Sequence, residues 1–297
     1  MILAGLVASR FLHLSALLIL LGCSLFPLYT DRSAKSIVRV RLIVFAAAIA
    51  ALVTGVFWFA FTTAGMSGSL AAVTNWPALS LVANSTAFGH IWVVRLILLA
   101  LVLVLFGIAA RNRQLWLGAT VVSGVAVASI AWAGHGQTGD GSAATGHVVS
   151  DVVHLFAAAI WIGALGGLLL MLRSGATVRE IAFALTAFSG LGPSTVALLV
   201  ISGIVNSLFL IGPPSSLFTT AYGITLVIKI ALFAAMLVFA LINRFRLTPR
   251  LAMAKDPAAE LDALCALKRS IGSETLLALL VMAAVALLGT FPPPGST

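Results

Sequence analysis

Residues 147–172 read HVVSDVVHLFAAAIWIGALGGLLLML and combine an apolar segment with a polar stripe. The segment Leu155–Leu172 carries no charged side chain, and with the residues before it reaches the length of about 20 residues that a membrane-spanning helix requires. In such a helix His147, Asp151 and His154 share one face, because they stand at positions i, i+4 and i+7. Polar groups inside a membrane are costly, so this stripe predicts a functional site.

The composition of the whole chain is that of a membrane protein. Hydrophobic residues make up 61% of the 297 residues and charged residues only 8%, whereas soluble domains contain about 25% charged residues. Eight apolar runs are long enough to cross a bilayer. They lie at about 3–28, 41–63, 88–110, 115–134, 148–172, 181–211, 221–243 and 271–291. We therefore expect an all-α polytopic protein with eight transmembrane helices in a lipid bilayer.

Basic residues are distributed unevenly among the connections between these helices. Of the 17 Lys and Arg residues, all but Arg10, Arg95 and Lys229 lie in alternate connections or at their ends, and the intervening connections contain none. The positive-inside rule places the basic connections in the cytoplasm and both termini outside. The formal net charge of +9 is then a signal of topology, and we expect no binding of nucleic acid.

The two halves of the chain resemble each other. The segment Ser9–Ala16 aligns with Ser150–Ala157, and this alignment pairs His13 with His154. It also pairs a basic residue with an acidic one at the second position of each segment. The helices that carry these two segments are therefore expected to be equivalent, although their polar side chains differ.

Two further pairs of segments support the duplication. TAFG at 86–89, followed by Arg95, aligns with TAYG at 220–223, followed at the same spacing by Lys229. A weaker pair consists of a hydroxyl residue followed by glycine, at Thr54-Gly55 and Ser202-Gly203.

The chain is accordingly divided into three parts. We expect a first four-helix repeat at 1–134, a Gly/Ser-rich outer loop at 135–146 and a second four-helix repeat at 147–297. Each repeat has four spans and begins on the same side, so the repeats are expected to be parallel, and ligand sites are expected where they meet.

All the histidines map to the outer half of the predicted membrane region. They are His13, His90, His135, His147 and His154. Imidazole and carboxylate ligands suit copper and other late first-row metal ions. The sequence therefore predicts a metal site in the outer half of the bundle.

Depth divides the candidate ligands into two groups. At about 1.5 Å of rise per residue, His154 lies roughly 10 Å deeper than His147, which is too far for both to bind one ion. We therefore predict an outer entry site, formed by His147 with Asp151 or His135, and a deeper site, formed by His154 with His13.

Each candidate also has a structural interpretation. His90 and His135 stand at helix ends, where histidines commonly make interfacial hydrogen bonds. Asp151 aligns with Arg10 and either binds metal or neutralises this arginine, because an unpaired charge in the membrane costs about 2.5–3.5 kcal/mol. A third role, in which Asp151 holds a neighbouring histidine by its other ring nitrogen, is compatible with both.

Three further polar side chains in the predicted spans are candidate supporting residues. Arg95 and Lys229 either extend toward the membrane surface or line a polar cavity, and their shared spacing from a glycine favours a structural role. Asn206 also lies in the outer half, where it is expected to bind metal or form a hydrogen bond.

Three glycines and the two cysteines also have expected roles. Gly163, Gly166 and Gly167 are expected to let their helix pack closely against a neighbour. Cys23 and Cys265 belong to the inner end of a span and to a cytoplasmic connection, so we expect no disulfide between them. We expect both cysteines to be structural, and the alternative for Cys23 is to accept a cuprous ion, because a thiol is a soft ligand.

Catalytic and nucleotide-binding motifs are absent from the sequence. It contains no Gly-x-x-x-x-Gly-Lys-Ser/Thr loop and no arrangement typical of a serine hydrolase. We therefore expect that the chain is not an enzyme and does not drive primary active transport by itself.

Several segments resemble the copper resistance protein D (CopD) family. They are HVVSDVVHLFAAAIWIGALGG at 147–167, SGIVN at 202–206, TAYG at 220–223 with Lys229, NR at 243–244 with Leu247 and Pro249, and RSI at 269–271 with Glu274. This resemblance implies a bacterial inner-membrane protein with eight spans that moves copper from periplasm to cytoplasm. It also implies a small periplasmic copper carrier of the CopC type as a partner. It assigns no ligands.

Three functions are therefore considered. The first is a copper-transporting protein with His147, Asp151, His135 and His90 around an outer entry and His13 and His154 deeper, the oxidation state of copper being open. The second is a haem b protein with His13 and His154 as axial ligands, because equal depth on equivalent helices suits this geometry. The third is a partner in the assembly of a copper enzyme.

Overall fold

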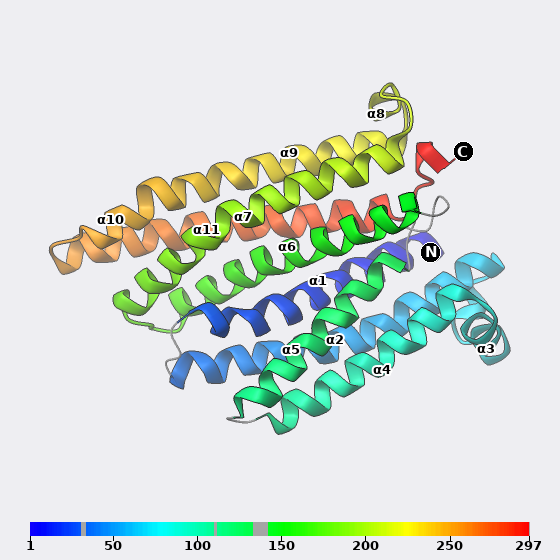
Figure 1. The fold of residues 1–297 in the computed structure, drawn as a ribbon, viewed down its shortest axis with the longest axis horizontal. Coiled ribbons are helices and arrows are strands. Elements are labelled where there is room, and N and C mark those ends of the chain that lie inside the picture. The colour runs from blue at the N-terminus through cyan, green and yellow to red at the C-terminus, as the bar shows by residue number, and fades with distance from the viewer. Residues whose placement is uncertain (31–33, 110–111, 133–141, 297) are drawn as a thin grey trace.

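Figure 1 shows the computed structural model, in which long helices form one elongated bundle. The structure describes residues 1–30, 34–109, 112–132 and 142–296. Within these ranges all regular secondary structure is helical. Eight helices are long and apolar enough to cross a membrane, which confirms the predicted class of an all-α polytopic membrane protein.

The spans are divided between the two halves of the chain. Those of the first half are α1 (Ile2–Tyr29), α2 (Ala34–Ser67), α4 (Ala87–Ile108) and α5 (Arg113–Ala128), which continues into the 3-10 turn η2 (Ser129–Trp132). Those of the second half are α6 (Ser142–Arg173), α7 (Val178–Ile211), α9 (Ala221–Ile242) and α11 (Pro257–Leu288). The shorter elements are η1 (Leu70–Val73), α3 (Trp76–Ser85), α8 (Ser216–Thr219), the π-helix η4 (Asn243–Leu247), α10 (Thr248–Ala252) and η5 (Pro294–Ser296).

The two ends of the bundle differ in character. Both chain termini lie at one end, together with α3 and α8 (Figure 1), and we call this end the terminal face. The opposite end, which we call the basic face, contains the end of α6 at Arg173, the start of α7 near Arg179 and the segment from Arg244 to Arg250. The candidate histidines that the structure describes, His13, His90, His147 and His154, lie in the half nearer the terminal face.

The two central helices, α1 and α6, lie side by side and share two neighbours (Figure 1). Both pack against α5 and against α11. On the outside, α2 packs on α1 as α7 packs on α6, and α4 pairs with α5 as α9 pairs with α11. These helix contacts of the first half thus have corresponding contacts in the second, but the packing of α2 against α4 has no counterpart of similar extent between α7 and α9.

Glycines let the backbones of α1 and α6 touch. A Cβ atom on Gly22 would lie 2.0 Å from the carbonyl oxygen of Ala159, and one on Gly163 would lie 2.1 Å from the carbonyl carbon of Gly22. Gly167 is packed as tightly, with a phenyl ring of α1 only 2.5 Å from its virtual Cβ, whereas Gly166 stands at an ordinary 3.4 Å from its nearest neighbour. The predicted close packing of this glycine segment is therefore confirmed at Gly163 and Gly167.

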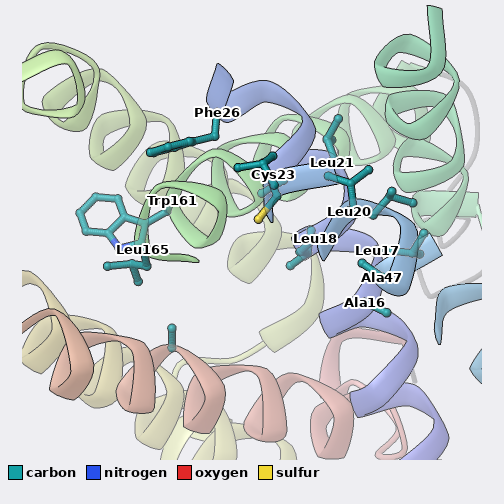
Figure 2. Packing of buried hydrophobic residues seen from close by; sticks show 14 of the residues in the cluster. Ala16, Leu17, Leu18, Leu20, Leu21, Cys23, Phe26, Ala47, Trp161 and Leu165 are labelled. Carbon is teal, nitrogen blue, oxygen red and sulfur yellow. The ribbon is translucent and has the colours of Figure 1, made fainter. Parts of the chain in front are cut away.

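The buried apolar side chains line this central contact. Figure 2 shows Phe26 of α1 on the side of Trp161 and Leu165 of α6, and Leu17 and Leu20 on the other side of α1, toward Ala47 of α2. Lipid tails are as apolar as leucine, so the association of these helices depends on close packing and interhelical hydrogen bonds more than on burial itself.

The TAFG and TAYG segments shape the start of α4 and α9. The hydroxyl of Thr86 accepts a hydrogen bond from the backbone N–H of Gly89 at 2.9 Å, and Thr220 does the same for Gly223 at 3.0 Å. Each threonine is thus the N-cap of its helix. In both glycines a Cβ would lie 2.1 Å from a carbonyl oxygen of the short helix that precedes, α3 or α8. The segment therefore caps one helix and lets another pack against it.

The last transmembrane helix begins earlier than predicted. The apolar run indicated a helix at 271–291, but α11 begins at Pro257 and ends at Leu288. Proline suits the first turn of a helix, and the side chain of Asp256 caps it by accepting from the N–H of Ala259 at 2.8 Å. The predicted start was wrong because hydropathy reports the membrane-buried part of a helix and not its polar extension.

Candidate functional site

The first buried histidine occupies a pocket between α1 and α2. Nδ1 of His13 lies 2.8 Å from the carbonyl oxygen of Ala51 and 3.5 Å from the hydroxyl of Thr54. Because a carbonyl can only accept, Nδ1 carries the proton and Nε2 presents a lone pair. This Nε2 is buried and has no hydrogen-bond partner among the described residues. Gly55 makes room for the ring, since a Cβ there would lie 3.1 Å from Cε1.

The second histidine, His154, is half-buried in the corresponding pocket between α6 and α7. Nδ1 of His154 lies 2.9 Å from the hydroxyl oxygen of Ser202. The serine hydroxyl donates its own proton to the carbonyl of Leu198, so Nδ1–H of the histidine is the donor. Gly203 lies beside the ring, with its virtual Cβ 3.6 Å from Cε1. Thr54-Gly55 and Ser202-Gly203 thus form the same type of cradle, and both histidines are held as the tautomer with a free Nε2.

These contacts bear on the predicted deep site. His13 hydrogen-bonds to α2 and His154 to α7, two helices that pack on different central helices. The hydrogen bonds of the two imidazoles therefore lead to different helices, and a site shared by His13 and His154 stays a prediction. None of these hydrogen bonds joins them into a shared site.

The pocket of His13 is lined by tryptophan and arginine. The imidazole lies 5.4 Å from the ring of Trp58 and 5.5 Å from that of Trp92, measured between centroids. The guanidinium of Arg10 lies 4.7 Å above Trp58, and that of Arg95 lies 4.5 Å above Trp92. We call these five residues the arginine–tryptophan cluster.

Cation–π contacts compensate only part of the cost of these arginines. A desolvated contact of this kind is worth about 2 kcal/mol, whereas insertion scales assign an arginine at mid-membrane a cost of about 2.5–3.5 kcal/mol. Among the described residues, the salt bridge found joins Arg250 and Asp262 near the basic face. Arg10 is therefore not directly paired with Asp151, which was one predicted role of that carboxylate.

The pocket of His154 has a different charge balance. Asp151 accepts a hydrogen bond from Nδ2 of Asn206 at 2.9 Å and interacts electrostatically with His147 and Lys229. The charge of Lys229 also interacts electrostatically with His154. One carboxylate and one ammonium group thus offset each other here.

His147, Asp151 and His154 form the polar stripe on α6, which we call the ladder. Its upper end, at His147, is the end nearer the terminal face. His147 is buried at its upper end, where it stacks on Phe209 with ring centroids 4.8 Å apart. Its Nδ1 has no hydrogen-bond partner within the part of the chain that the structure describes. Among those residues, no three His, Cys, Asp or Glu side chains come together as one metal site. His147, Asp151 and His154 therefore provide successive pairs of groups along α6.

The remaining predicted ligands lie elsewhere. His90 is exposed at the start of α4, and its Nε2 lies 2.9 Å from the carbonyl oxygen of Asn84. This contact is the interfacial hydrogen bond that was the structural interpretation of His90. His135 lies outside the described residues.

Sequence reasoning missed one buried carboxylate as a structural centre. Glu274 of α11 accepts hydrogen bonds from Nε1 of Trp161 at 3.0 Å and from Nδ2 of Asn243 at 2.9 Å. It thereby joins α11 to α6 and to the π-helix after α9. An isolated glutamate within an apolar run was the available signal, but its partners are 113 and 31 residues away in sequence.

The fold and these pockets define a polytopic membrane protein with imidazole, carboxylate and ammonium groups buried between its helices. Residues 1–146 match the family described as "Copper resistance protein D-like, N-terminal domain", and residues 182–288 match the family "Copper resistance protein D". The chain belongs to the copper resistance protein D family.

Three relatives illustrate this membership. "Copper resistance protein D" of Pseudomonas syringae pv. tomato is 32% identical over 97% of this chain and 96% of its own length. "Inner membrane protein YebZ" of Escherichia coli strain K12 is 30% identical over 85% of this chain and 88% of its own. "Copper transport protein CutJ" of Bacillus subtilis strain 168 is 29% identical over 53% of this chain and 30% of its own. No solved structure matches the chain.

Proposed function

We propose that this protein is a transporter, not an enzyme, that carries copper across the bacterial inner membrane from the periplasm towards the cytoplasm. Its family and the names of its relatives, which include a copper transport protein and an inner membrane protein, support this assignment. The observation that carries it is the ladder of His147, Asp151 and His154 on one face of a transmembrane helix.

The hydrogen bonds of the ladder suit metal transfer. A histidine whose Nδ1–H is held by the protein offers Nε2 as a metal ligand of fixed orientation, as His154 does. His147 has a free Nδ1 at the upper end. Asp151 is one helical turn from each histidine. An ion held by His147 and Asp151 can therefore exchange His147 for His154 while Asp151 stays bound to it.

Asn206 and Lys229 support this path. The Asn206 amide fixes one oxygen of Asp151, which leaves the other oxygen for the ion. Lys229 balances the carboxylate while the ladder is empty. An arriving cation takes over this role, and the repulsion between cation and ammonium then favours movement of the ion onward.

We place the copper path in the second half of the chain. His13 has the same tautomer as His154, but it lies against Trp58 and Trp92, the two rings that the guanidinium groups of Arg10 and Arg95 cover. Two positive charges repel a copper ion in a medium of low dielectric constant. The two pockets thus derive from duplicated parallel repeats in which one copy has kept, or acquired, a charge balance suitable for a cation.

The terminal face is the periplasmic entrance in this proposal. It contains the upper end of the ladder, and the positive-inside rule assigns the basic face to the cytoplasm. A periplasmic copper carrier of the CopC type would deliver its ion at this face, where α3 presents an exposed surface.

Copper binding and uptake by purified protein test the proposal. We expect His154→Ala and Asp151→Asn to lower uptake into proteoliposomes at least tenfold and to reduce bound copper, measured by elemental analysis. His90→Ala is the matched control, because this exposed histidine lies outside the ladder, and it should behave like the wild type. Equal copper content and uptake in all four proteins would refute the assignment.

An absorption spectrum of the same preparations distinguishes the haem alternative. Copper transport through the ladder predicts no strong Soret band. A Soret band that disappears in both His13→Ala and His154→Ala would replace the proposal by a haem b protein.

A further inference from the structure

The arginine–tryptophan cluster contains buried donors that the copper path does not use. Arg95 is fully buried, and its Nε and Nη2 donate to the hydroxyl and the carbonyl of Ser129 at 2.8 and 2.7 Å. Its Nη1, the Nε of Arg10 and the Nε1 of Trp92 are also buried, yet they have no hydrogen-bond partner among the described residues. Three unpaired donors in one group of touching side chains are exceptional, because buried polar groups are normally satisfied.

The cluster also carries positive charge that no carboxylate among the described residues balances. Arg10 and Arg95 both carry positive charge, and neither is in a salt bridge within the described part of the chain. In the second half, Asp151 stands at the position of Arg10, and Lys229 stands at the position of Arg95. The same scaffold therefore holds a balanced pair of charges in one half and an uncompensated pair of cations in the other.

We propose that the arginine–tryptophan cluster is a binding site for the phosphate group of an anionic ligand. Phosphate oxygens accept hydrogen bonds from the three free donors, and the negative charge compensates the two guanidinium groups. A phosphate that retains one hydroxyl also donates to the free Nε2 of His13, which is an acceptor in its observed tautomer. The site would be independent of the ladder on α6, so it adds to the proposed copper transport.

A groove provides one route for such a ligand. It has a volume of about 820 Å³ and runs between α4, α5, α1 and α6, with Val94, Gly124 and Phe156 among its lining residues. Its lining is almost wholly apolar, but it includes Ser129, the residue that holds Arg95. A phospholipid can place its chains in this groove with its phosphate toward Arg95. Inorganic phosphate from the aqueous side offers the same chemistry, with Arg10 as a half-buried point of contact.

Two measurements distinguish these sources. Native mass spectrometry of the purified protein detects a retained phospholipid. After delipidation, the melting temperature in detergent is measured against inorganic phosphate, with chloride at equal ionic strength as the reference. A retained phospholipid supports the lipid source, and saturable stabilisation by inorganic phosphate supports the free anion.

The variant Arg10→Gln is the main test, because it removes a charge from the half-buried edge and not from the fully buried interior. We expect it to lose the bound phospholipid or to weaken the response to phosphate at least tenfold. Arg250→Gln, near the basic face, should match the wild type, and Arg10→Lys should recover part of the response. His154→Ala should keep the phosphate response even where it abolishes copper uptake.

Two results would overturn the proposal. One is a wild-type protein that carries no phospholipid as purified and that, after delipidation, is not stabilised by phosphate beyond chloride. The other is an Arg10→Gln variant that binds lipid or phosphate as the wild type does.

Discussion

Side chains buried in a bilayer must find their hydrogen-bond partners within the protein, because the hydrocarbon core contains no water. Glu274 meets this requirement for two donors from different helices, Trp161 and Asn243. Asn243 begins the π-helix at the end of α9, and such irregular turns are often found at functional sites. The carboxylate thus fixes the position of three helices in the half nearer the basic face.

We expect Glu274→Ala to be strongly destabilising. It leaves two buried donors unpaired, each at a cost of about 1–3 kcal/mol. Glu274→Gln retains one acceptor oxygen, so its melting temperature in detergent should lie between those of the wild type and the alanine variant. Glu260→Ala, in the first turn of the same helix, is the control and should change the melting temperature little. Equal effects of the three substitutions would argue against this role of Glu274.

The candidate site shows which residue relations a sequence reveals. Spacing along one helix is sufficient to place His147, Asp151 and His154 on one face and to separate the two histidines in depth. Spacing does not identify the partners of these residues on other helices. The contact between His154 and Ser202 spans 48 residues, and only the repeated hydroxyl-glycine pair marked it in the sequence.

At the scale of elements, the crossing of α1 and α6 organises the bundle. Gly22 and Gly163 contact each other across it, and each stands nine residues after the histidine of its helix. The same helices therefore carry both the closest backbone contact and the two histidine pockets, so a change in the crossing would alter the distance of each pocket from its partner helix.

We expect Gly22→Ala and Gly163→Ala to disturb this crossing. A new Cβ would meet backbone atoms at 2.0 and 2.1 Å, and overpacking of this kind costs about 1–3 kcal/mol or more. Gly118→Ala is the matched control, because a Cβ there meets no described atom within 4 Å. It should leave the melting temperature unchanged or raise it, since alanine favours helix by about 1 kcal/mol over glycine.

Helix positions were more predictable than helix contacts. The thickness of the bilayer sets the length of a span, and for this reason the apolar runs located all eight helices. The start of α11 at Pro257 was missed because its first turns are polar. The packing partners of each helix were not predictable from hydropathy, because a helix that is apolar on all sides gives no indication of which face meets the protein and which meets the lipid.

For the whole molecule, the main contrast is between matching packing and different charge. Most helix contacts of the two halves correspond, the contact of α2 with α4 being the exception, and both halves place a histidine in a hydroxyl-glycine cradle. The charged residues around the cradles differ, with Arg10 and Arg95 in one half and Asp151 and Lys229 in the other. In the two proposals, one scaffold serves a cation in the pocket of His154 and an anion in the pocket of His13.

The direction of transport depends on the orientation of the molecule in the membrane, which the native cysteines can report. Cys265 is exposed in the part of α11 that precedes its predicted span, whereas Cys23 is buried. With both termini in the periplasm, a membrane-impermeant maleimide should label Cys265 only after the cells are permeabilised. Ser85→Cys, at the exposed end of α3 and in a Cys265→Ser background, should be labelled in intact cells. The opposite pattern would place the upper end of the ladder in the cytoplasm, and the proposed path would then lead copper out of the cell.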